Sequence, residues 1–288
     1  MASSRSANEE ATMNRAFLVG INAYPGNELQ GCVNDVTDMA DFLVSHCGFD
    51  EGDIRLLTDA RATTSAILER VNWLLQGVTA GDRIVFHYSG HGAQFPVRGQ
   101  DGKVTRVDEC ICPVDFDWTE EHAIRDKQFN ELFKAVPKGV DFEWVSDSCF
   151  SGDLAREMQP PKRRIKAMPM PADIAWRMRT AETKGMKLQG FEHVVKNLNV
   201  VLISGCSARE TSADAEIDGR FNGALTYYLL QTLTGPMGLT QDLGHAVART
   251  RAALNKGGYS QHPQLEGSPD LMQEPFLNLG QKKKAAGA

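Results

Sequence analysis

The chain has 288 residues, 42% of them hydrophobic, and a formal net charge of −6. This length can bury the core of one large α/β domain. The mild acidity argues against nucleic-acid binding, which requires a basic face. No apolar run approaches the roughly 20 residues of a membrane span, so we expect no membrane association. The polar first 14 residues and the six scattered cysteines favour a cytoplasmic protein without a signal peptide.

Short apolar runs alternate along the first 150 residues with stretches in which apolar residues recur at helical spacing. The runs predict buried strands at 16–21, 54–57, 84–86 and 142–145. The other stretches predict helices over 36–47, 67–75 and 129–136, the first with Asn34 or Asp35 as N-cap and Gly48 as its end. Residues 96–109 are expected to form a charged loop. This alternation of strand and helix favours a parallel sheet with right-handed crossovers.

Residues 156–187 interrupt the alternation, because they hold four prolines and nine Lys or Arg against three acids. Such a stretch is typical of a linker or a long excursion. Beyond it we expect a strand at 199–204 and helices near 225–233 and 243–254. We therefore divide the chain into a disordered tail (1–15), a larger catalytic part (16–155), a basic linker or excursion (156–196), a smaller part of the same domain (197–280) and a basic tail (281–288).

A histidine and a cysteine stand just beyond two predicted strands, in the segments His-Tyr-Ser-Gly-His-Gly (87–92) and Asp-Ser-Cys-Phe-Ser-Gly (147–152). Sites in open α/β sheets form outside the carboxyl ends of the strands. An imidazole can convert a thiol to a thiolate near neutral pH. His91 and Cys149 are therefore predicted to form the dyad of a cysteine hydrolase, although a lone histidine or cysteine is more often structural. A zinc pair with His87 would need a helix and a glutamate, so we interpret His87 as a packed strand residue.

Other cysteines are weaker candidates for chemistry. Cys110 and Cys112 occupy alternate positions, which indicates a strand and neither a zinc nor a redox motif. Cys32 lies just past the first predicted strand, near the expected site. Cys206 follows a predicted strand as Cys149 does and is the rival nucleophile, but it lacks a comparable histidine.

Acidic residues indicate two further sites. Asp35 and Asp147 lie beyond strand ends on the edge that carries the dyad. A helix cap is the default interpretation of Asp35, but two converging carboxylates would also bind a Lys or Arg side chain. Asp101, Asp108 and Glu109 belong to an acidic stretch whose oxygens suit Ca²⁺. Its spacing is not that of an EF-hand, and a solvated loop is the simpler interpretation from the residues alone.

The segments around His91 and Cys149 resemble the two active-site signatures of metacaspases, the caspase-like peptidases of bacteria, fungi, protists and plants. The similarity extends from about residue 16 to 280, through segments 31–35, 108–115, 205–208, 212–215, 223–226 and 262–265. With no prodomain before the domain and a short linker within it, the chain is most similar to a prodomain-less type I or prokaryotic metacaspase.

The resemblance implies a caspase–hemoglobinase fold, an α/β fold whose mostly parallel central sheet is flanked by helices. It implies His91 as the base, Cys149 as the nucleophile, and a pocket for Arg or Lys. The candidate substrate-binding residues are Asp35, Asp147, Cys32 and Ser89.

The resemblance also implies Ca²⁺ activation through Asp101, Asp108 and Glu109. Two positions depart from the family pattern. Arg156 stands near the place of a further acid that family members often carry after the nucleophile, with Asp153 closer in. Phe150 replaces the histidine that often follows the cysteine.

We expect Cys149, assisted by His91, to attack the carbonyl after an Arg or Lys of a protein or peptide, with backbone N–H groups of Cys149 and Gly92 holding the oxyanion. The basic linker offers candidate self-cleavage sites, with a solvated surface loop as the alternative. These candidates are Arg163, Arg164 and Lys166. The alternative functions are a cysteine hydrolase with another side-chain preference, and a non-proteolytic scaffold or aggregate-binding protein. The resemblance favours a monomer.

Overall fold

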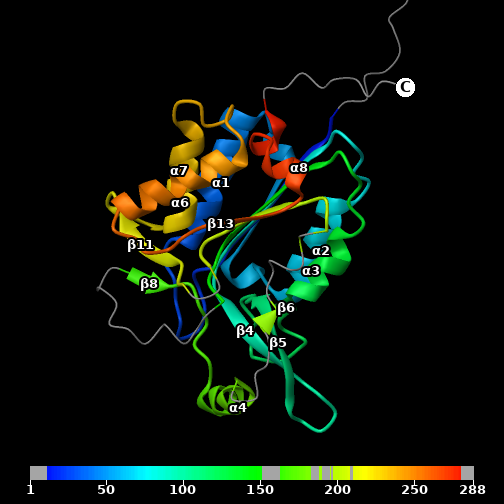
Figure 1. Ribbon diagram of the computed structural model, residues 1–288, viewed down its shortest axis with the longest axis vertical. Coiled ribbons are helices and arrows are strands. Elements are labelled where there is room, and N and C mark those ends of the chain that lie inside the picture. Colours follow the sequence, from blue (N-terminus) through cyan, green and yellow to red (C-terminus); the bar gives the residue numbers. More distant parts are fainter. Residues whose placement is uncertain are drawn as a thin grey trace, which may run out of the picture.

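A six-stranded sheet in the order β13-β10-β7-β3-β1-β2 forms the centre of the computed structural model (Figure 1), which describes residues 12–150, 163–182, 188–189, 195, 197–207 and 210–279. Five of its strands are mutually parallel: β1 (Asn14–Gly20), β2 (Ile54–Thr58), β3 (Arg83–Ser89), β7 (Asp141–Asp147) and β10 (Val201–Ser204). At one edge, β13 (Gln264–Gly267) pairs antiparallel with β10. The predicted mostly parallel α/β sheet is confirmed.

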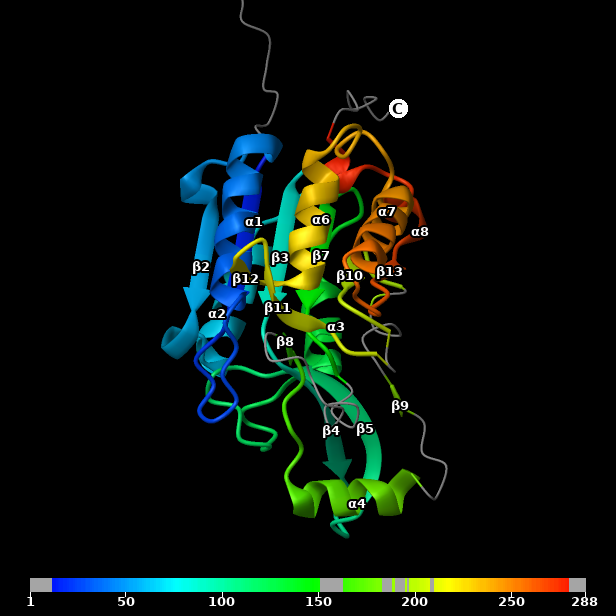
Figure 2. The ribbon, with the colours of Figure 1, turned by 90° about the vertical axis from the view of Figure 1, so that its left-hand side faces the viewer.

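Helices cover both faces of this sheet (Figures 1 and 2). One face is covered by α1 (Cys32–Cys47), α6 (Ala224–Thr234) and α7 (Leu243–Lys256), and the other by α2 (Thr64–Leu75) and α3 (Asp126–Phe133). Successive strand residues point to opposite faces. Phe86 and Trp144 therefore pack with α2 and α3, whereas Val85 and Val145 pack with α1 and α6.

Two smaller sheets lie beside the central one. The first consists of β4 (Gly92–Arg98), β5 (Val104–Ile111) and β6 (Ile124–Arg125), with β9 (Leu188–Gln189) paired to β5. The second has the order β12-β11-β8, formed by Arg220–Gly223, Ala213–Ile217 and Arg163–Ile165. The short helices are η1 (Glu51–Asp53), η2 (Asp59–Arg61), α8 (Pro269–Met272) and η4 (Phe276–Asn278).

Three expectations from the sequence were wrong. Residues 96–109 form most of the β4–β5 hairpin, because their apolar members alternate and pair across it. Helix α1 begins at Cys32 with Gly31 as N-cap, so Asp35 lies inside the helix. Strand β1 begins at Asn14, so the last two residues of the predicted disordered tail (1–15) belong to the central sheet. Within the expected excursion, helix α4 (Ala172–Glu182) packs against β5 through Ile174 and Met178. Arg156, Asp153, residues 1–11 and the predicted basic tail (281–288) lie outside the described residues.

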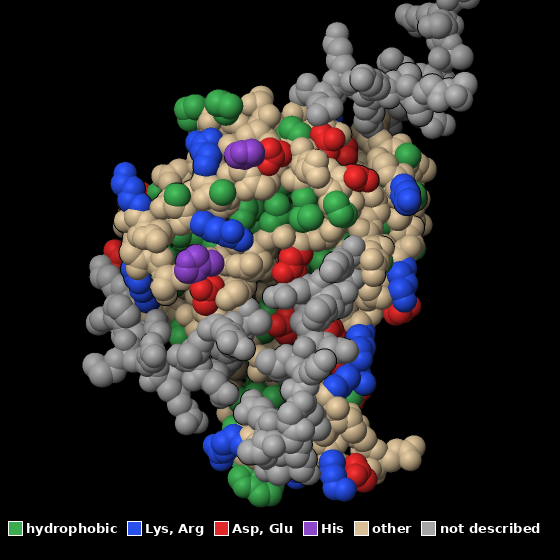
Figure 3. Space-filling view, in the orientation of Figure 1, with side chains coloured by type: hydrophobic (Ala, Val, Ile, Leu, Met, Phe, Trp, Pro, Cys, Tyr) green, Lys and Arg blue, Asp and Glu red, His purple; other side chains and the backbone are tan. Residues whose placement is uncertain are grey.

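The surface mixes charges of both signs. On the face shown in Figure 3, Lys and Arg side chains are interspersed with Asp and Glu. Within the described residues, no helix has both the length and the apolar character needed to cross a membrane.

Glu143 is a carboxyl group in the middle of β7. It is 4% exposed and accepts a hydrogen bond from the Leu277 backbone at 2.7 Å. Burial raises the pKa of Glu143 from its ordinary 4.5 to about 8. The pKa of Glu143 is thus higher in the folded than in the unfolded protein. The group therefore contributes stability that is present below pH 4.5 and is lost as the pH rises through 8.

We therefore expect Glu143→Gln to remove a pH-dependent loss of stability on the order of 5 kcal/mol between pH 4.5 and 9. The glutamine keeps the acceptor for Leu277 and never ionises. Urea unfolding of both proteins across this range, with Glu69→Gln on the surface as control, measures the difference. Parallel pH profiles for the wild type and Glu143→Gln would contradict the prediction.

Candidate active site

The carboxyl ends of the neighbouring parallel strands β3 and β7 carry the predicted dyad. Strands β3 and β7 lie side by side, with Ser89 paired to Asp147 at their ends. His91 and Cys149 each follow two residues later, and both are buried, at 3% and 0% exposed. The edge predicted from the sequence is therefore the edge on which these groups gather.

The His91 ring is held by backbone and by an aromatic side chain. Its Nε2 lies 2.7 Å from the carbonyl oxygen of Asn27, and the Tyr24 ring packs on it at 4.6 Å between centroids. A carbonyl oxygen only accepts, so Nε2 carries the proton and Nδ1 holds the lone pair. Nδ1 is buried without a hydrogen-bond partner. Burial lowers the pKa of His91 to about 4, so the ring is a neutral base at pH 7.

Two thiols lie together beyond β7 and β10. Cys149 donates to the carbonyl of Glu210 at 2.8 Å, and Cys206 donates to the same oxygen at 3.3 Å. Hydrogen bonding to Cys149, followed by burial, raises the pKa of Cys206 well above its ordinary value. The direction of this shift disfavours ionisation of Cys206.

Lys166, from the basic excursion, extends into a fully buried pocket. Its Nζ lies 3.0 Å from Asp35 Oδ2 and 3.2 Å from Asp147 Oδ1. It also donates to Ser89 Oγ at 2.8 Å. The Ser89 hydroxyl donates in turn to Asp35 at 2.6 Å. Asp35 and Asp147 thus converge, as predicted for a bound Lys or Arg, on a lysine of the same chain.

One ammonium group faces two carboxylates in this pocket. Burial alone lowers the pKa of Lys166, but Asp147 and Asp35 together raise it above its ordinary value. Burial opposes ionisation of Asp147, yet Lys166 and the hydrogen bonds from Ser212 and Thr226 lower its pKa. Burial raises the pKa of Asp35 to about 6. Asp147 is therefore the firmly ionised partner, and Asp35 is the one that protonates first.

The main chain of Lys166 is bound as closely as its side chain. Its carbonyl oxygen accepts hydrogen bonds from Gly92 N–H at 3.0 Å and Cys149 N–H at 3.1 Å. These are the two N–H groups predicted to hold an oxyanion. Lys166 N–H donates to the Ser212 carbonyl at 3.0 Å, and Cys149 packs against Ala167, the residue that follows Lys166. A side chain at position 92 would meet the Cys149 carbonyl at 2.6 Å, which explains the glycine.

Several residues of the site lie in the segments that resemble metacaspases, but the sequence analysis gave them no role. Ser212 and Thr226 both bind the Asp147 carboxylate, at 2.7 and 2.9 Å. Asp214 accepts from the backbone of Gln30 and Gly31 at 2.7 and 2.8 Å. Their motif positions were the only signal, because each pairs with a residue more than 60 positions away.

Gly223 forms a wall of the Lys166 pocket. A side chain there would collide with Lys166, Asp35 and Asp147. Cys32, the remaining substrate-binding candidate, is fully buried at the start of α1.

The acids predicted to bind calcium do not form a common site. Asp101 pairs with Lys103 at 2.9 Å, and the buried Asp108 is bound by Arg106 at 2.8 Å and Arg125 at 3.4 Å. Within the described ranges, no three acidic, histidine or cysteine side chains gather as metal ligands. Neighbouring guanidinium groups already occupy the oxygens of Asp108. With Asp101 and Asp108 already paired to basic side chains, this arrangement does not fit a calcium ion.

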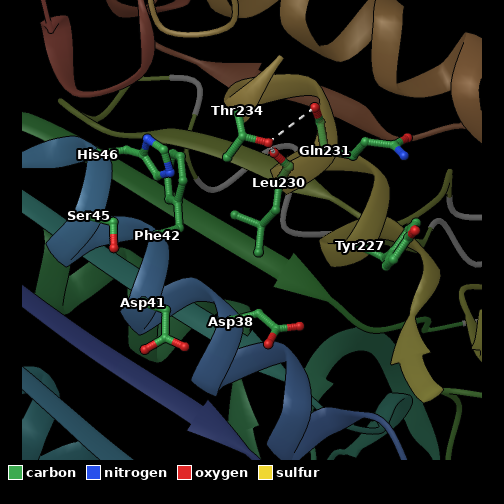
Figure 4. Close-up of a pocket in the computed structure, with 9 residues that line it drawn as sticks. All are labelled: Asp38, Asp41, Phe42, Ser45, His46, Tyr227, Leu230, Gln231 and Thr234. Carbon is green, nitrogen blue, oxygen red and sulfur yellow. Dashed lines mark hydrogen bonds between the residues drawn. The ribbon is translucent and has the colours of Figure 1, made fainter. Parts of the chain in front are cut away.

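Other features lie outside the site. His87 is buried in β3 and hydrogen-bonds Thr226 at 3.2 Å, in agreement with a packed strand residue. A hollow on the helical face is lined by Phe42 and His46 of α1 and by Tyr227 and Leu230 of α6 (Figure 4). None of the dyad or pocket residues lines it.

Comparisons with known proteins find similar sequences over most of the chain. The metacaspase peptidase C14 domain matches residues 14–156. Metacaspase-1 of Debaryomyces hansenii is 31% identical over 300 residues, which cover 91% of this chain and 67% of that relative. The chain belongs to the metacaspase family. Metacaspase-9 of Arabidopsis thaliana is 29% identical, with 91% of this chain and 96% of that relative covered.

Two further comparisons define the extent of the likeness. Metacaspase-1 of Cryptococcus neoformans is 32% identical over 88% of this chain, and the chain spans only 62% of that metacaspase. A crystal structure of a Geobacter sulfurreducens protein has a TM-score of 0.64, at 24% identity and with 92% and 98% of the two chains covered. At that identity the structure supports the fold alone.

Proposed function

We propose that the protein is a cysteine endopeptidase that cleaves after Lys or Arg and processes its own chain between Lys166 and Ala167. The observation that carries the proposal is the double binding of Lys166. Its ammonium group lies between Asp35 and Asp147. Its carbonyl oxygen accepts hydrogen bonds from both N–H groups that would stabilise an oxyanion.

In the proposed reaction, His91 Nδ1 takes the thiol proton of Cys149, and the thiolate attacks the Lys166 carbonyl carbon. The developing negative charge falls on the oxygen already bound by Gly92 and Cys149 N–H. Losing one such donor raises the barrier by about 2.7–4 kcal/mol. His91 then gives its proton to the departing Ala167 amine, and water hydrolyses the thioester.

The Asn27 carbonyl supports this cycle. By accepting from Nε2 at 2.7 Å, it fixes the tautomer in which Nδ1 is the base. When the ring becomes an imidazolium, the same contact becomes a charge-assisted hydrogen bond, which stabilises the intermediate.

The position of the self-cleavage cut distinguishes the three candidate sites, Arg163, Arg164 and Lys166. Mass spectrometry of the incubated wild type should find a fragment that begins at Ala167. Lys166→Arg should preserve this cut, because Arg also binds two carboxylates, whereas Lys166→Gln should abolish it. Arg164→Gln, at an exposed position, is the matched control and should leave the cut in place. A cut after Arg163 or Arg164, or an intact chain, would overturn self-processing at Lys166.

Calcium activation stays a prediction from the family resemblance, as do the cytoplasmic location and the monomeric state. Each incubation is therefore run with and without millimolar Ca²⁺. No step proposed above involves the ion.

A further inference from the structure

The segment that ends at Lys166 lies on the protein as an added strand. Strand β8 pairs antiparallel with β11, with Ile165 opposite Ala213 and Arg163 opposite Ala215. Main-chain pairing of this kind is a common mode of peptide recognition, in which alternate side chains enter separate subsites. Lys166 enters the acidic pocket, so the residues before it report on how the neighbouring surface would hold a substrate.

Arg163, three positions before Lys166, is held by two different contacts. Its guanidinium carbon lies 4.3 Å from the centroid of the Tyr259 ring. Its Nη1 donates to the Gly258 carbonyl at 3.1 Å. A guanidinium over an aromatic face is attracted by the ring quadrupole, and the hydrogen bond to the carbonyl is charge-assisted.

The two groups that contact Arg163 are held in place by the surrounding structure. Tyr259 is only 8% exposed and packs against Tyr228, at 5.7 Å between ring centroids. Gly258 has a φ of +79° in the turn after α7, and the residue is exposed. The carboxyl end of a helix carries partial negative charge, which favours a cation there.

We propose that Tyr259 and the Gly258 carbonyl form a second specificity subsite, which selects a basic side chain three positions before the cleaved bond. This rests on the proposed function, in which segment 163–166 occupies the substrate path. The substrate class is thus a peptide with Lys or Arg both at the cleavage position and three residues earlier.

The test compares two peptides, Arg-Arg-Ile-Lys and Ala-Arg-Ile-Lys, each with a fluorogenic group after the lysine. The full-length wild type should cleave the first with about tenfold higher kcat/KM, chiefly through KM, because the contact is equally strong in ground and transition states. Tyr259→Phe, which keeps the ring, should preserve this ratio. Tyr259→Leu, which keeps the apolar bulk, should reduce it to about twofold.

Each outcome bears on one claim. Equal cleavage of the two peptides by the wild type would overturn the subsite while leaving the lysine specificity intact. A Tyr259→Leu variant that is slower on both peptides with an unchanged ratio would assign Tyr259 a structural role only, which also overturns the subsite. Failure of the wild type to cleave either peptide would refute the proposed function itself.

Discussion

Cys149→Ala should lower peptide cleavage after Lys or Arg by at least about a thousandfold, because it removes the sulfur that forms the thioester in the proposed reaction. Its sulfur lies beyond β7 at the edge that also carries His91. The variant should fold normally, since alanine removes only one buried sulfur. The measurement is hydrolysis of fluorogenic peptides together with self-cleavage of the chain.

Cys206→Ala is the matched control, because Cys206 donates to the same Glu210 carbonyl as Cys149. We expect this variant to keep most of its activity. Full activity in Cys149→Ala would contradict the dyad. If Cys149→Ala also retained every cellular effect of the protein, the non-proteolytic scaffold would be the better account.

Asp147→Asn should lower kcat/KM for peptides ending in Lys by about a hundredfold or more. Removing one partner from a buried, hydrogen-bonded charge pair typically costs 2–5 kcal/mol, about 30-fold to several thousandfold. Asp147 is 0% exposed, 3.2 Å from the Lys166 ammonium, and is the more firmly ionised of the two pocket carboxylates. Asp35→Asn should have the same direction of effect.

Asp38→Asn provides the control, since Asp38 lies one turn after Asp35 on α1 and pairs with Arg220 on the surface at 2.8 Å. Its kcat/KM should match that of the wild type. Circular dichroism verifies that all three variants are folded. An Asp147→Asn enzyme with unchanged kcat/KM for lysine peptides would exclude the pocket as the specificity site.

Local pattern predicted the five parallel strands of the central sheet and put His91 and Cys149 at the ends of two of them, but it missed the antiparallel edge strand β13. The apolar runs before His91 and Cys149 are strands β3 and β7, and parallel pairing puts their ends together. The prediction of Asp35 as N-cap failed because the helix starts one turn earlier, at Cys32, where the chain is fixed by contacts from elsewhere. Asp214, for example, binds the backbone at Gly31 from 183 residues away.

For the same reason, the sequence could not predict which basic side chain occupies the acidic pocket. Arg163, Arg164 and Lys166 are all basic and lie within one short segment, so composition cannot distinguish them. Which side chain enters the pocket depends on the register of β8 against β11 and on the bridge that Ala167 forms with Gly92. The β4–β5 hairpin was missed because its charged residues resemble a solvated loop, although Asp108 is buried against Arg106.

The most direct measurement of the central claim is cleavage of four peptides that differ only at the final residue, Lys, Arg, Asp or Leu, by the purified full chain with and without Ca²⁺. The acidic pocket predicts cleavage after Lys and Arg, in at least one of the two conditions, and none after Asp or Leu. Cleavage after Asp or Leu, or no cleavage under either condition, would contradict it.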